Sequence, residues 1–305
     1  MLYDILIIGT GPAGITAGIY AKRANLKVAM FEKDTPGGQL SKYNEIENYT
    51  GVKKVAGYEL ATMMIDHAYE IGVEVIYDEV IKVELDGNTK IVTTPTKKYK
   101  AKAVIVATGN VPRRLGVENE DALAMNGISW CAICDGPLFK ERKLIVVGGG
   151  NSAVEEASYL ATLASHVTVV QNLDDLTADP KAQDILRAMK NVDFRYGSVV
   201  KKFLMTDQKE LTGAIITNKK GEEETILADG VFEYVGLIPV TTFIKDLGCT
   251  NKYGFIETNE KMETKVPGIY GAGDVIVKQI RQVVTATSDG AIAVQNVLRY
   301  LETWE

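Results

Sequence analysis

The sequence predicts an α/β fold made of two dinucleotide-binding (Rossmann-like) domains. Residues 3–32 and 142–171 share one pattern: a β-branched apolar run, a glycine turn, a helical stretch of small and apolar residues, and a second apolar run. Such strand–helix–strand units open parallel sheets. The length of 305 residues also suits two domains better than one core.

The order of the remaining segments predicts that one domain is inserted into the other. A strand-like run, AVIVATG, ends at Gly109 and is followed by Pro112, and a later run, VFEYVGLIPV, ends near Pro239. A new glycine motif, GIYGAGD, then precedes the helical pattern SDGAIAVQNVLRYLETW. We therefore expect residues 1–114 and 242–305 to form one discontinuous domain, with 115–241 inserted through two short crossings.

Composition and charge exclude several classes of function. The chain is 46% hydrophobic and 24% charged, and its net charge of −6 gives no reason to expect binding to nucleic acid or to a membrane surface. No apolar run approaches the roughly 18 residues that a transmembrane helix needs. The apolar start, MLYDILIIGTGPAG, lacks the basic residues of an export signal, so a cytoplasmic location is expected.

Three cysteines, Cys131, Cys134 and Cys249, are too few for a disulfide framework. They also cannot supply the four thiolates of an iron–sulfur cluster. The two histidines, His67 and His166, lie far from the cysteine pair in sequence, which makes a zinc site hard to assemble. We expect no metal site.

The first glycine motif, GTGPAG at residues 9–14, follows a strand and opens a helix. Gly9 permits the tight turn, Gly11 lets a pyrophosphate approach the backbone, and Gly14 lets the helix pack on the strand. The helix start offers free N–H groups to phosphates. Glu32 ends the next strand, 23 residues after Gly9, where a carboxylate can bind a ribose. Motif, context and acid together predict a bound dinucleotide.

The stretch SWCAICDG places Cys131 and Cys134 three residues apart. This spacing closes a small, readily reduced disulfide and lowers the pKa of one thiol, as nucleophilic exchange requires. Two buried structural cysteines, or half of a metal site, are the alternatives for such a pair taken alone.

Two further segments, GGQL at residues 37–40 and GAGD at 271–274, are not required by a simple NAD fold. With these segments and the cysteine pair, the chain resembles the flavin-linked disulfide reductases, in particular the low-molecular-weight thioredoxin reductases, over essentially its whole length. The resemblance implies FAD as cofactor, thioredoxin as partner and a homodimer. The residues that it assigns to FAD are Gly9, Gly11, Pro12, Ala13, Gly14, Glu32, Gly38, Gln39, Leu40, Asn48, Gly109, Gly273, Asp274, Arg281 and Gln282.

The same resemblance gives roles to the residues of the cysteine motif. Cys134 is the thiol that faces the flavin, and Cys131 is the interchange thiol that attacks the partner disulfide. Asp135 is the general acid/base that protonates the leaving thiolate. Cys249 lies outside the motif, in LGCTNKYG, and is expected to be structural.

The second glycine motif, GGGNSA at residues 148–153, keeps the backbone pattern of a dinucleotide site but lacks its charges. Gln171 stands where an NAD site would carry an acid. The NADPH-dependent thioredoxin reductases carry His-Arg-Arg-x-x-x-Arg here, whereas this chain reads Gln171, Asn172, Leu173 and then Thr177. Losing two or three charge-assisted hydrogen bonds would cost about 3–9 kcal/mol. Three aspartates add negative charge: Asp174, Asp175 and Asp179.

Two enzyme hypotheses and one alternative class follow. In the first, the chain uses NAD(P)H and finds its arginine elsewhere, for example at Arg187 or Arg195. In the second, which we favour, it resembles the ferredoxin-dependent flavin thioredoxin reductases, because flavin can collect single electrons for two-electron disulfide chemistry. A flavin redox sensor without turnover is the alternative, although it would not need an intact CAICD. Ferredoxins are usually acidic, so a basic docking patch is expected. The candidate residues are Lys97, Lys98, Lys100, Lys102, Arg113 and Arg114. The alternative is that these residues are merely solvated side chains or strand ends.

Overall fold

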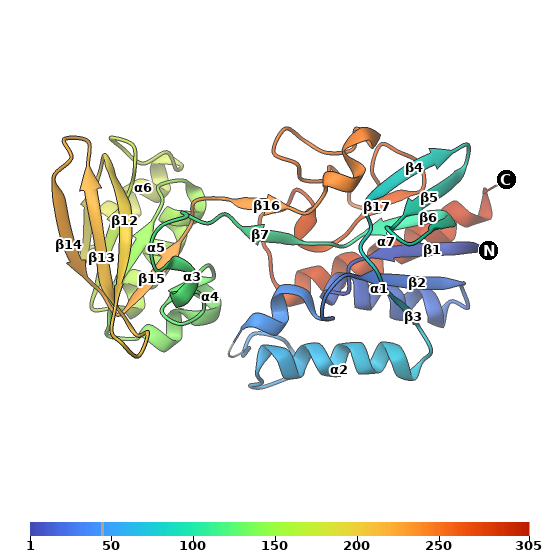
Figure 1. Ribbon diagram of the computed structural model, residues 1–305, viewed down its shortest axis with the longest axis horizontal. Helices are drawn as coiled ribbons and strands as arrows, with labels where there is room; N and C mark the ends of the chain where they lie inside the picture. The colour runs from blue at the N-terminus through green and yellow to red at the C-terminus, as the bar shows by residue number, and fades with distance from the viewer. Residues whose placement is uncertain (44–45, 305) are drawn as a thin grey trace. The chain divides into compact units, whose positions relative to one another are not determined.

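The computed structural model describes residues 1–43 and 46–304 and divides the chain into two compact units. The first is Met1–Val111 with Ile238–Glu305, and the second is Pro112–Leu237. Both are α/β units with a parallel sheet, so the predicted fold class is confirmed (Figure 1). The sequence predicts the first boundary after residue 114, and the units meet after residue 111. It predicts the second boundary before residue 242, and the units meet before residue 238.

The first unit is built on one mixed sheet with the strand order β3-β2-β1-β6-β5-β4, and β17 also pairs with β6. Strands β1, β2, β3 and β17 belong to its parallel part, whereas β4 and β5 form an antiparallel hairpin on the first half of β6. The bounds are β1 Leu2–Ile8, β2 Val28–Glu32, β3 Glu74–Tyr77, β4 Lys82–Asp86, β5 Thr89–Thr93, β6 Lys98–Val106 and β17 Ile269–Gly271.

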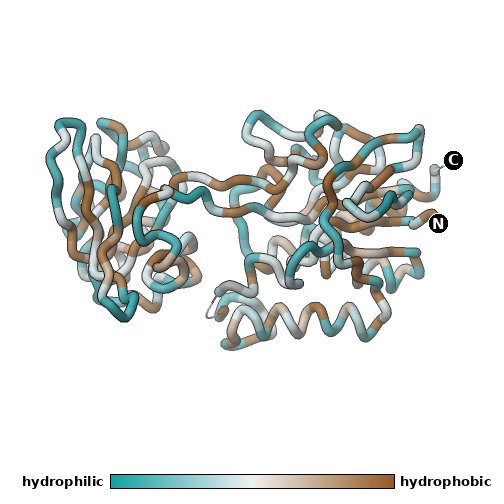
Figure 2. Tube along the Cα trace, viewed as in Figure 1, coloured by the Kyte–Doolittle hydropathy of each residue, from teal (hydrophilic) through white to brown (hydrophobic). Residues whose placement is uncertain are grey.

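Three long helices accompany this sheet: α1 (Pro12–Arg23), α2 (Gly57–Glu70) and α7 (Val283–Glu302). Helix α1 has proline at its start and basic residues in its last turn, both of which favour a helix at those positions. Helix α7 packs so closely on α1 that a Cβ at Gly290 would lie 2.2 Å from the Ala13 carbonyl oxygen. Along α2, hydrophobic and hydrophilic residues alternate (Figure 2), as expected of a helix with one buried face. The short helices are η1 (Gly38–Lys42), η3 (Thr242–Leu247) and η4 (Gly273–Val275).

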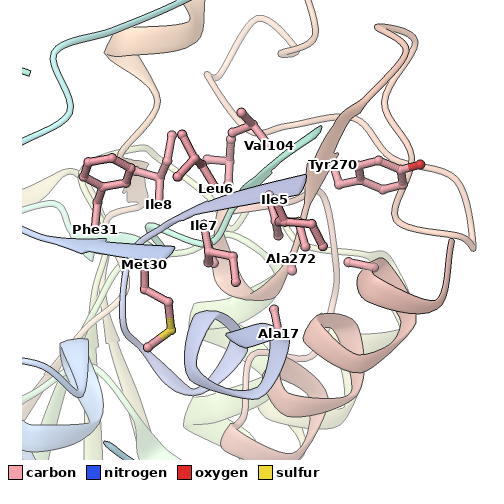
Figure 3. Close-up of a cluster of buried hydrophobic side chains, with 14 of the residues drawn as sticks. Ile5, Leu6, Ile7, Ile8, Ala17, Met30, Phe31, Val104, Tyr270 and Ala272 are labelled. Atoms are coloured by element: carbon pink, nitrogen blue, oxygen red, sulfur yellow. The ribbon is translucent and has the colours of Figure 1, made fainter. Parts of the chain in front are cut away.

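The core of the first unit lies on both faces of the parallel strands. Figure 3 shows Ile5, Ile7 and Met30 pointing toward helix α1, whereas Leu6, Ile8 and Phe31 point to the opposite side. All six side chains are almost completely buried. A parallel strand covered on two faces needs this continuous apolar run rather than an alternating pattern.

The second unit holds a parallel sheet with the order β11-β10-β9-β15-β8 and a separate antiparallel sheet, β12-β13-β14. The sequence analysis did not anticipate the three-stranded sheet. Helix α5 (Asn151–Leu163) follows β9 through the second glycine turn and packs against β9 and β10. The other bounds are β8 Ile128–Ser129, β9 Lys143–Val147, β10 His166–Val170, β11 Val192–Arg195, β12 Ser198–Met205, β13 Leu211–Asn218, β14 Glu223–Leu227, β15 Gly230–Glu233, α3 Glu120–Leu123, α4 Ala132–Asp135, η2 Gly136–Phe139 and α6 Pro180–Arg187.

The chain passes between the units twice, at 111–112 and at 237–238. These crossings lie within β7 (Asn110–Pro112) and β16 (Leu237–Pro239), which pair as a two-stranded sheet. Among the described residues, no helix is both long and apolar enough to cross a membrane.

Candidate active site

The first glycine motif is shaped by close backbone contacts. Gly9 has a φ of +104°, and a Cβ there would lie 2.6 Å from the Ala107 carbonyl oxygen. A Cβ at Gly14 would lie 1.9 Å from the Gly9 carbonyl oxygen. At Gly11, by contrast, a Cβ would meet no other part of the described chain within 4 Å. Gly9 and Gly14 therefore serve packing, whereas the space at Gly11, at the start of α1, is open to a ligand.

The GGQL segment folds onto this motif. The Gly37 N–H donates to the Thr10 carbonyl oxygen at 2.8 Å, and a Cβ at Gly38 would lie 3.4 Å from the Gly11 Cα. Glu32, at the end of β2, accepts hydrogen bonds from the Thr10 hydroxyl and, at 2.9 Å, from the Asp34 N–H. Gly37 caps the short helix η1, which begins at Gly38; Leu40 is buried and Gln39 half-buried within it.

The second half of the first unit contributes two buried polar groups without partners. Asp274 Oδ1 and Arg281 Nε are buried and have no hydrogen-bond partner among the described residues. Burial raises the pKa of Asp274 and lowers the pKa of Arg281. Asn110 donates to the Asp274 carbonyl oxygen at 2.9 Å and follows Gly109, whose φ is +65°. Orphaned buried groups of this kind point to a polar ligand that completes them.

Further contacts bring distant site residues together. Asn48 Nδ2 donates to Gln282 Oε1 at 2.9 Å, although 234 residues separate them. The sequence analysis missed Lys278 and Asp289, which form a buried ion pair at 2.5 Å. Asp289 also accepts the Gly273 N–H at 3.0 Å, so it fixes the turn that carries Asp274. An acid inside the apolar helix pattern SDGAIAV was the available signal.

The redox pair lies in the second unit, where Cys131 and Cys134 form a disulfide across the short helix α4. The Cys131 N–H donates to Ser129 Oγ at 3.1 Å, and that hydroxyl donates to Asp135 Oδ2 at 2.6 Å. Asp135 is buried, and burial raises the pKa of its carboxyl group. Both cysteines are half-buried, so the pair can be reached, and a buried acid lies next to it.

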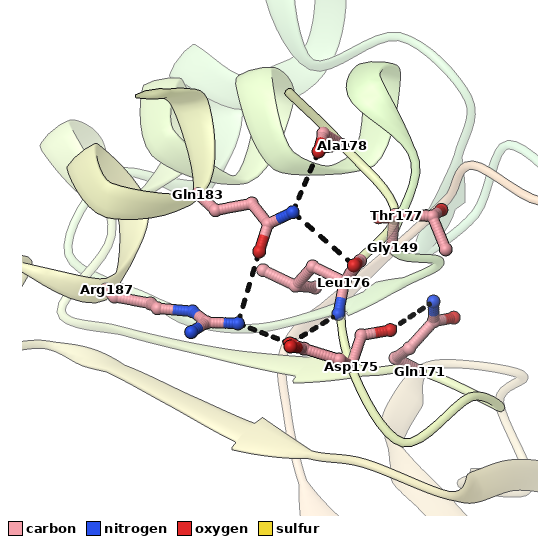
Figure 4. A network of polar contacts seen from close by, with 8 residues as sticks. All are labelled: Gly149, Gln171, Asp175, Leu176, Thr177, Ala178, Gln183 and Arg187. Carbon is pink, nitrogen blue, oxygen red and sulfur yellow. Dashed lines mark hydrogen bonds and ion pairs between the residues drawn. The ribbon is translucent and has the colours of Figure 1, made fainter. Parts of the chain in front are cut away.

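Gly149, the middle glycine of the second motif, is covered by its own chain. The Gln171 side chain lies across Gly149, so that a Cβ there would be 2.3 Å from Gln171 Nε2. Gln171 is anchored by donating to the Asp175 carbonyl oxygen at 3.2 Å (Figure 4). Its side-chain oxygen also accepts the Asn172 N–H at 3.0 Å. The Thr177 N–H donates to the Gly149 carbonyl oxygen at 2.8 Å. Segment 171–177 therefore packs on Gly149, whereas at Gly150, which holds the position of Gly11 at the start of its helix, a Cβ would meet only Thr177 Oγ1 among the described residues, at 3.9 Å.

The cations around this motif already have acidic partners. Arg187 pairs with Asp175 and donates to Gln183 at 3.2 Å (Figure 4). Arg195 Nε lies 2.9 Å from a carboxylate oxygen of Glu224. Lys219 pairs with Asp174 at 2.5 Å, which removes another cation from the loop.

The residues expected to form a basic docking patch are dispersed. Three of the lysines, Lys98, Lys100 and Lys102, lie in the first half of β6. This is the end of the sheet opposite the turn at Gly9. Lys102 pairs with Asp4 at 2.7 Å, whereas Lys97 lies over the Tyr99 ring. The two arginines, Arg113 and Arg114, belong to the second unit.

A flavin-linked disulfide oxidoreductase is the class that the fold and these two sites define. The model of the pyridine nucleotide-disulphide oxidoreductases matches residues 3–290. Over 306 residues the chain is 45% identical to a thioredoxin reductase of Bacillus subtilis, covering 99% of this chain and 95% of that protein. It is 41% identical over 300 residues to the "34.2 kDa protein in rubredoxin operon" of Clostridium pasteurianum, covering 98% and 97%. The solved thioredoxin reductase of Streptococcus pyogenes superposes with a TM-score of 0.92, at 46% identity and 99% coverage of both chains.

The chain belongs to the pyridine nucleotide-disulphide oxidoreductase family, among its thioredoxin reductases. FAD is therefore its cofactor, and the first unit fits that group. The open approach at Gly11 suits a pyrophosphate, and the buried Asp274 Oδ1 and Arg281 Nε, which have no hydrogen-bond partner among the described residues, suit the polar remainder of the flavin nucleotide. When bound, FAD can take up electrons one at a time and pass them on in pairs.

Proposed function

We propose that this protein reduces thioredoxin with electrons from reduced ferredoxin rather than from NAD(P)H. The observation that carries the donor assignment is the charge around the second glycine motif: Gln171 stands where an NAD site would carry an acid, and the nearby arginines are paired with acids. A pyridine nucleotide would find no arginine in segment 171–178 to bind a 2′-phosphate. The two arginines available nearby, Arg187 and Arg195, are already bound to Asp175 and Glu224.

The disulfide site supports the chemistry of the reaction. In the dithiol state, the Cys131 thiolate attacks the partner disulfide, forms a mixed disulfide and expels one partner thiolate. Asp135, whose pKa is raised by burial, is the group placed to supply the proton to that leaving group. Cys134 then attacks Cys131, which releases the second partner thiol and restores the Cys131–Cys134 disulfide. Each cycle uses two electrons, and therefore two one-electron donor molecules.

The relative encoded in a rubredoxin operon lends further support, because its name associates a protein of this kind with an iron-containing redox carrier. The acceptor is proposed from the thioredoxin reductases that match the whole chain. The intact cysteine motif and its neighbouring acid favour turnover over a sensing role.

Anaerobic flavin bleaching tests the donor. The holoenzyme is mixed separately with NADPH, NADH and chemically reduced ferredoxin, and the flavin absorbance is followed. We expect rapid bleaching by ferredoxin alone, followed by reduction of added thioredoxin. Rapid bleaching by either pyridine nucleotide would refute the donor assignment. A Cys131→Ser variant is the control, because it should bleach normally yet leave thioredoxin oxidised.

A further inference from the structure

Strand β15 lies between the two functional segments of the second unit. It pairs in parallel with β9, which leads into the second glycine turn, and with β8, which leads into the cysteine motif. Because parallel strands end at the same edge of a sheet, the residue that follows β15 stands next to both segments. That residue is Tyr234.

The main chain of Tyr234 is fixed against the glycine turn. A Cβ at Gly148 would lie 2.5 Å from the Tyr234 carbonyl oxygen. The first unit has the same arrangement, in which a Cβ at Gly9 would lie 2.6 Å from the Ala107 carbonyl oxygen. In both units the backbone N–H of the covering residue donates, at 2.8 Å, to the last carbonyl oxygen of the strand before the turn. Tyr234 and Ala107 therefore hold equivalent positions in the two sheets.

The side chains at these equivalent positions differ in reach. Ala107 ends in a methyl group, whereas the Tyr234 hydroxyl extends to the cysteine motif and accepts the Ala132 N–H at 2.8 Å. Ala132 is completely buried and lies between the two cysteines. The residue before the tyrosine, Glu233, accepts the Trp130 indole N–H at 2.9 Å. The tyrosine thus adds, in the unit that carries the disulfide, a contact that the alanine of the other unit cannot make.

The backbone donors of the redox turn are satisfied one by one. The Cys131 N–H donates to Ser129 Oγ at 3.1 Å, and the Cys134 N–H donates to Cys131 Sγ at 3.2 Å. Ala132 is the first residue of helix α4, where an N–H has no acceptor within the helix. Tyr234 supplies that acceptor. Without the hydroxyl, a buried N–H would lose its hydrogen bond, which costs free energy.

This cost falls unequally on the two redox states of the cysteine pair. The closed disulfide joins both ends of the turn, so the Ala132 N–H cannot move to another acceptor or to water. In the dithiol this covalent constraint is gone and the turn can relax. The bond from Ala132 to Tyr234 therefore stabilises the disulfide more than the dithiol. Since the dithiol returns to the disulfide when it reduces a partner, the bond makes the dithiol a stronger reductant.

We propose that Tyr234 is a positioning residue for the redox disulfide: its main chain is fixed on the second glycine turn, and its hydroxyl holds the Ala132 N–H and thereby favours the disulfide over the dithiol. This role rests on the proposed function, in which the Cys131–Cys134 pair exchanges with a partner disulfide. The glycine turn then supports the disulfide whether or not a nucleotide binds there.

The equilibrium between disulfide and dithiol tests this role. Tyr234→Phe removes the hydroxyl and keeps the ring. The FAD-loaded protein is equilibrated without oxygen in mixtures of reduced and oxidised dithiothreitol, and thiols are alkylated and counted by mass. The protein disulfide gains two electrons and two protons while dithiothreitol closes to its cyclic disulfide. We expect the equilibrium constant for reducing the protein to rise about tenfold in the variant, equivalent to about 30 mV.

A matched variant and two further measurements separate positioning from packing. Tyr159→Phe removes a hydroxyl from another ring beside the motif, one that packs at Gly136, and should leave the equilibrium constant unchanged. In urea unfolding, Tyr234→Phe should lower the stability of the oxidised protein more than that of the reduced protein. In the oxidised protein, hydrogen exchange at the Ala132 amide should become faster in Tyr234→Phe.

The outcomes distinguish this role from the proposed function. An equilibrium constant within about twofold of the parent's in Tyr234→Phe would refute the positioning role, and so would equal losses of stability in the two redox states. A tenfold shift that Tyr159→Phe does not share would establish it. If the shift is present but the parent protein passes no electrons to thioredoxin, the proposed function is overturned while the positioning role is supported.

Discussion

Lys278 and Asp289 form an ion pair whose side chains are only 13% and 11% exposed, and the same carboxylate accepts the Gly273 N–H at 3.0 Å. Helix α7 thereby fixes the turn that carries Asp274. We expect Lys278→Met to lower the free energy of unfolding by about 3–5 kcal/mol, because it leaves a buried carboxylate without its cation. Urea unfolding of the FAD-loaded protein measures this change. A loss below about 1 kcal/mol would contradict the structural role, and Lys201→Met, at an exposed pair, is the matched control.

Asp274 should contribute to FAD affinity directly. Its unpartnered Oδ1 is buried, and a charge-assisted hydrogen bond contributes about 1.5–3 kcal/mol. Asp274→Ala should therefore weaken FAD binding by roughly 10- to 100-fold. Flavin fluorescence during titration of the apoprotein gives the dissociation constant. Asp207→Asn, at an exposed turn, should bind FAD normally, and equal affinity in both variants would remove Asp274 from the site.

The three cysteines should behave differently on replacement. Cys131→Ser should reduce thioredoxin reduction by at least about 10³-fold, because the attacking thiolate is gone. Cys249 is 1% exposed and free of any disulfide, so Cys249→Ser should retain the rate per folded molecule. Thioredoxin thiols released under excess donor provide the assay. Comparable loss in both variants would indicate a general packing defect rather than exchange chemistry.

The buried acid next to the disulfide should make stability depend on pH. The folded pKa of Asp135 is raised above its ordinary value of 3.8. The folded state therefore binds more protons than the unfolded state between these two values, and stability falls as the pH rises through that window. Asp135→Asn should flatten this part of the profile. The free energy of unfolding, measured by urea at a series of pH values from about 4 upward, checks the slope. An unchanged slope would show that Asp135 titrates normally.

Arg187 discriminates between the two donor hypotheses. Its pair with Asp175 is exposed, so Arg187→Ala should cost only about 0.2–1 kcal/mol of stability. The rate of ferredoxin-driven reduction should stay within about twofold of the parent's rate, because Arg187 takes no part in the proposed reaction. If Arg187 instead binds the 2′-phosphate of NADPH, the parent protein will show NADPH-driven turnover that the variant lacks. Steady-state rates with each donor distinguish the two results.

Local patterns made the first glycine motif predictable from the sequence. The spacing of Gly9, Gly11 and Gly14 encodes a turn. Gly14 packs on Gly9 and Ile7 of the same strand–helix–strand unit, whereas Gly9 also packs against Ala107 outside it. Glu32 could be placed for the same reason, because it ends the next strand. The meaning of residues 271–274 and of Cys131 came from the resemblance rather than from spacing.

Contacts between distant segments could not be predicted in this way. Glu233 looked like one acid in an apolar run, and its partners Trp130 and Glu120 lie over 100 residues earlier. Gln171 was recognised as a missing acid, but the sequence did not show that its side chain would lie across Gly149. The antiparallel sheet β12–β14 was missed because its strands carry a mixed pattern with bulges rather than a clear alternation.

The pairing of β7 with β16 brings the two chain crossings between the units side by side. Bonds from Arg113 N to the Gly236 carbonyl oxygen and from Val240 N to the Gly109 carbonyl oxygen flank the crossing, so Val111 lies opposite Ile238. Paired strands are about 5 Å apart, which a tight hairpin turn can bridge. Excising residues 112–237 and closing the gap with Asn-Gly would leave the flavin unit an uninterrupted chain. The second unit is thus attached at what would otherwise be the tip of a hairpin of the flavin unit.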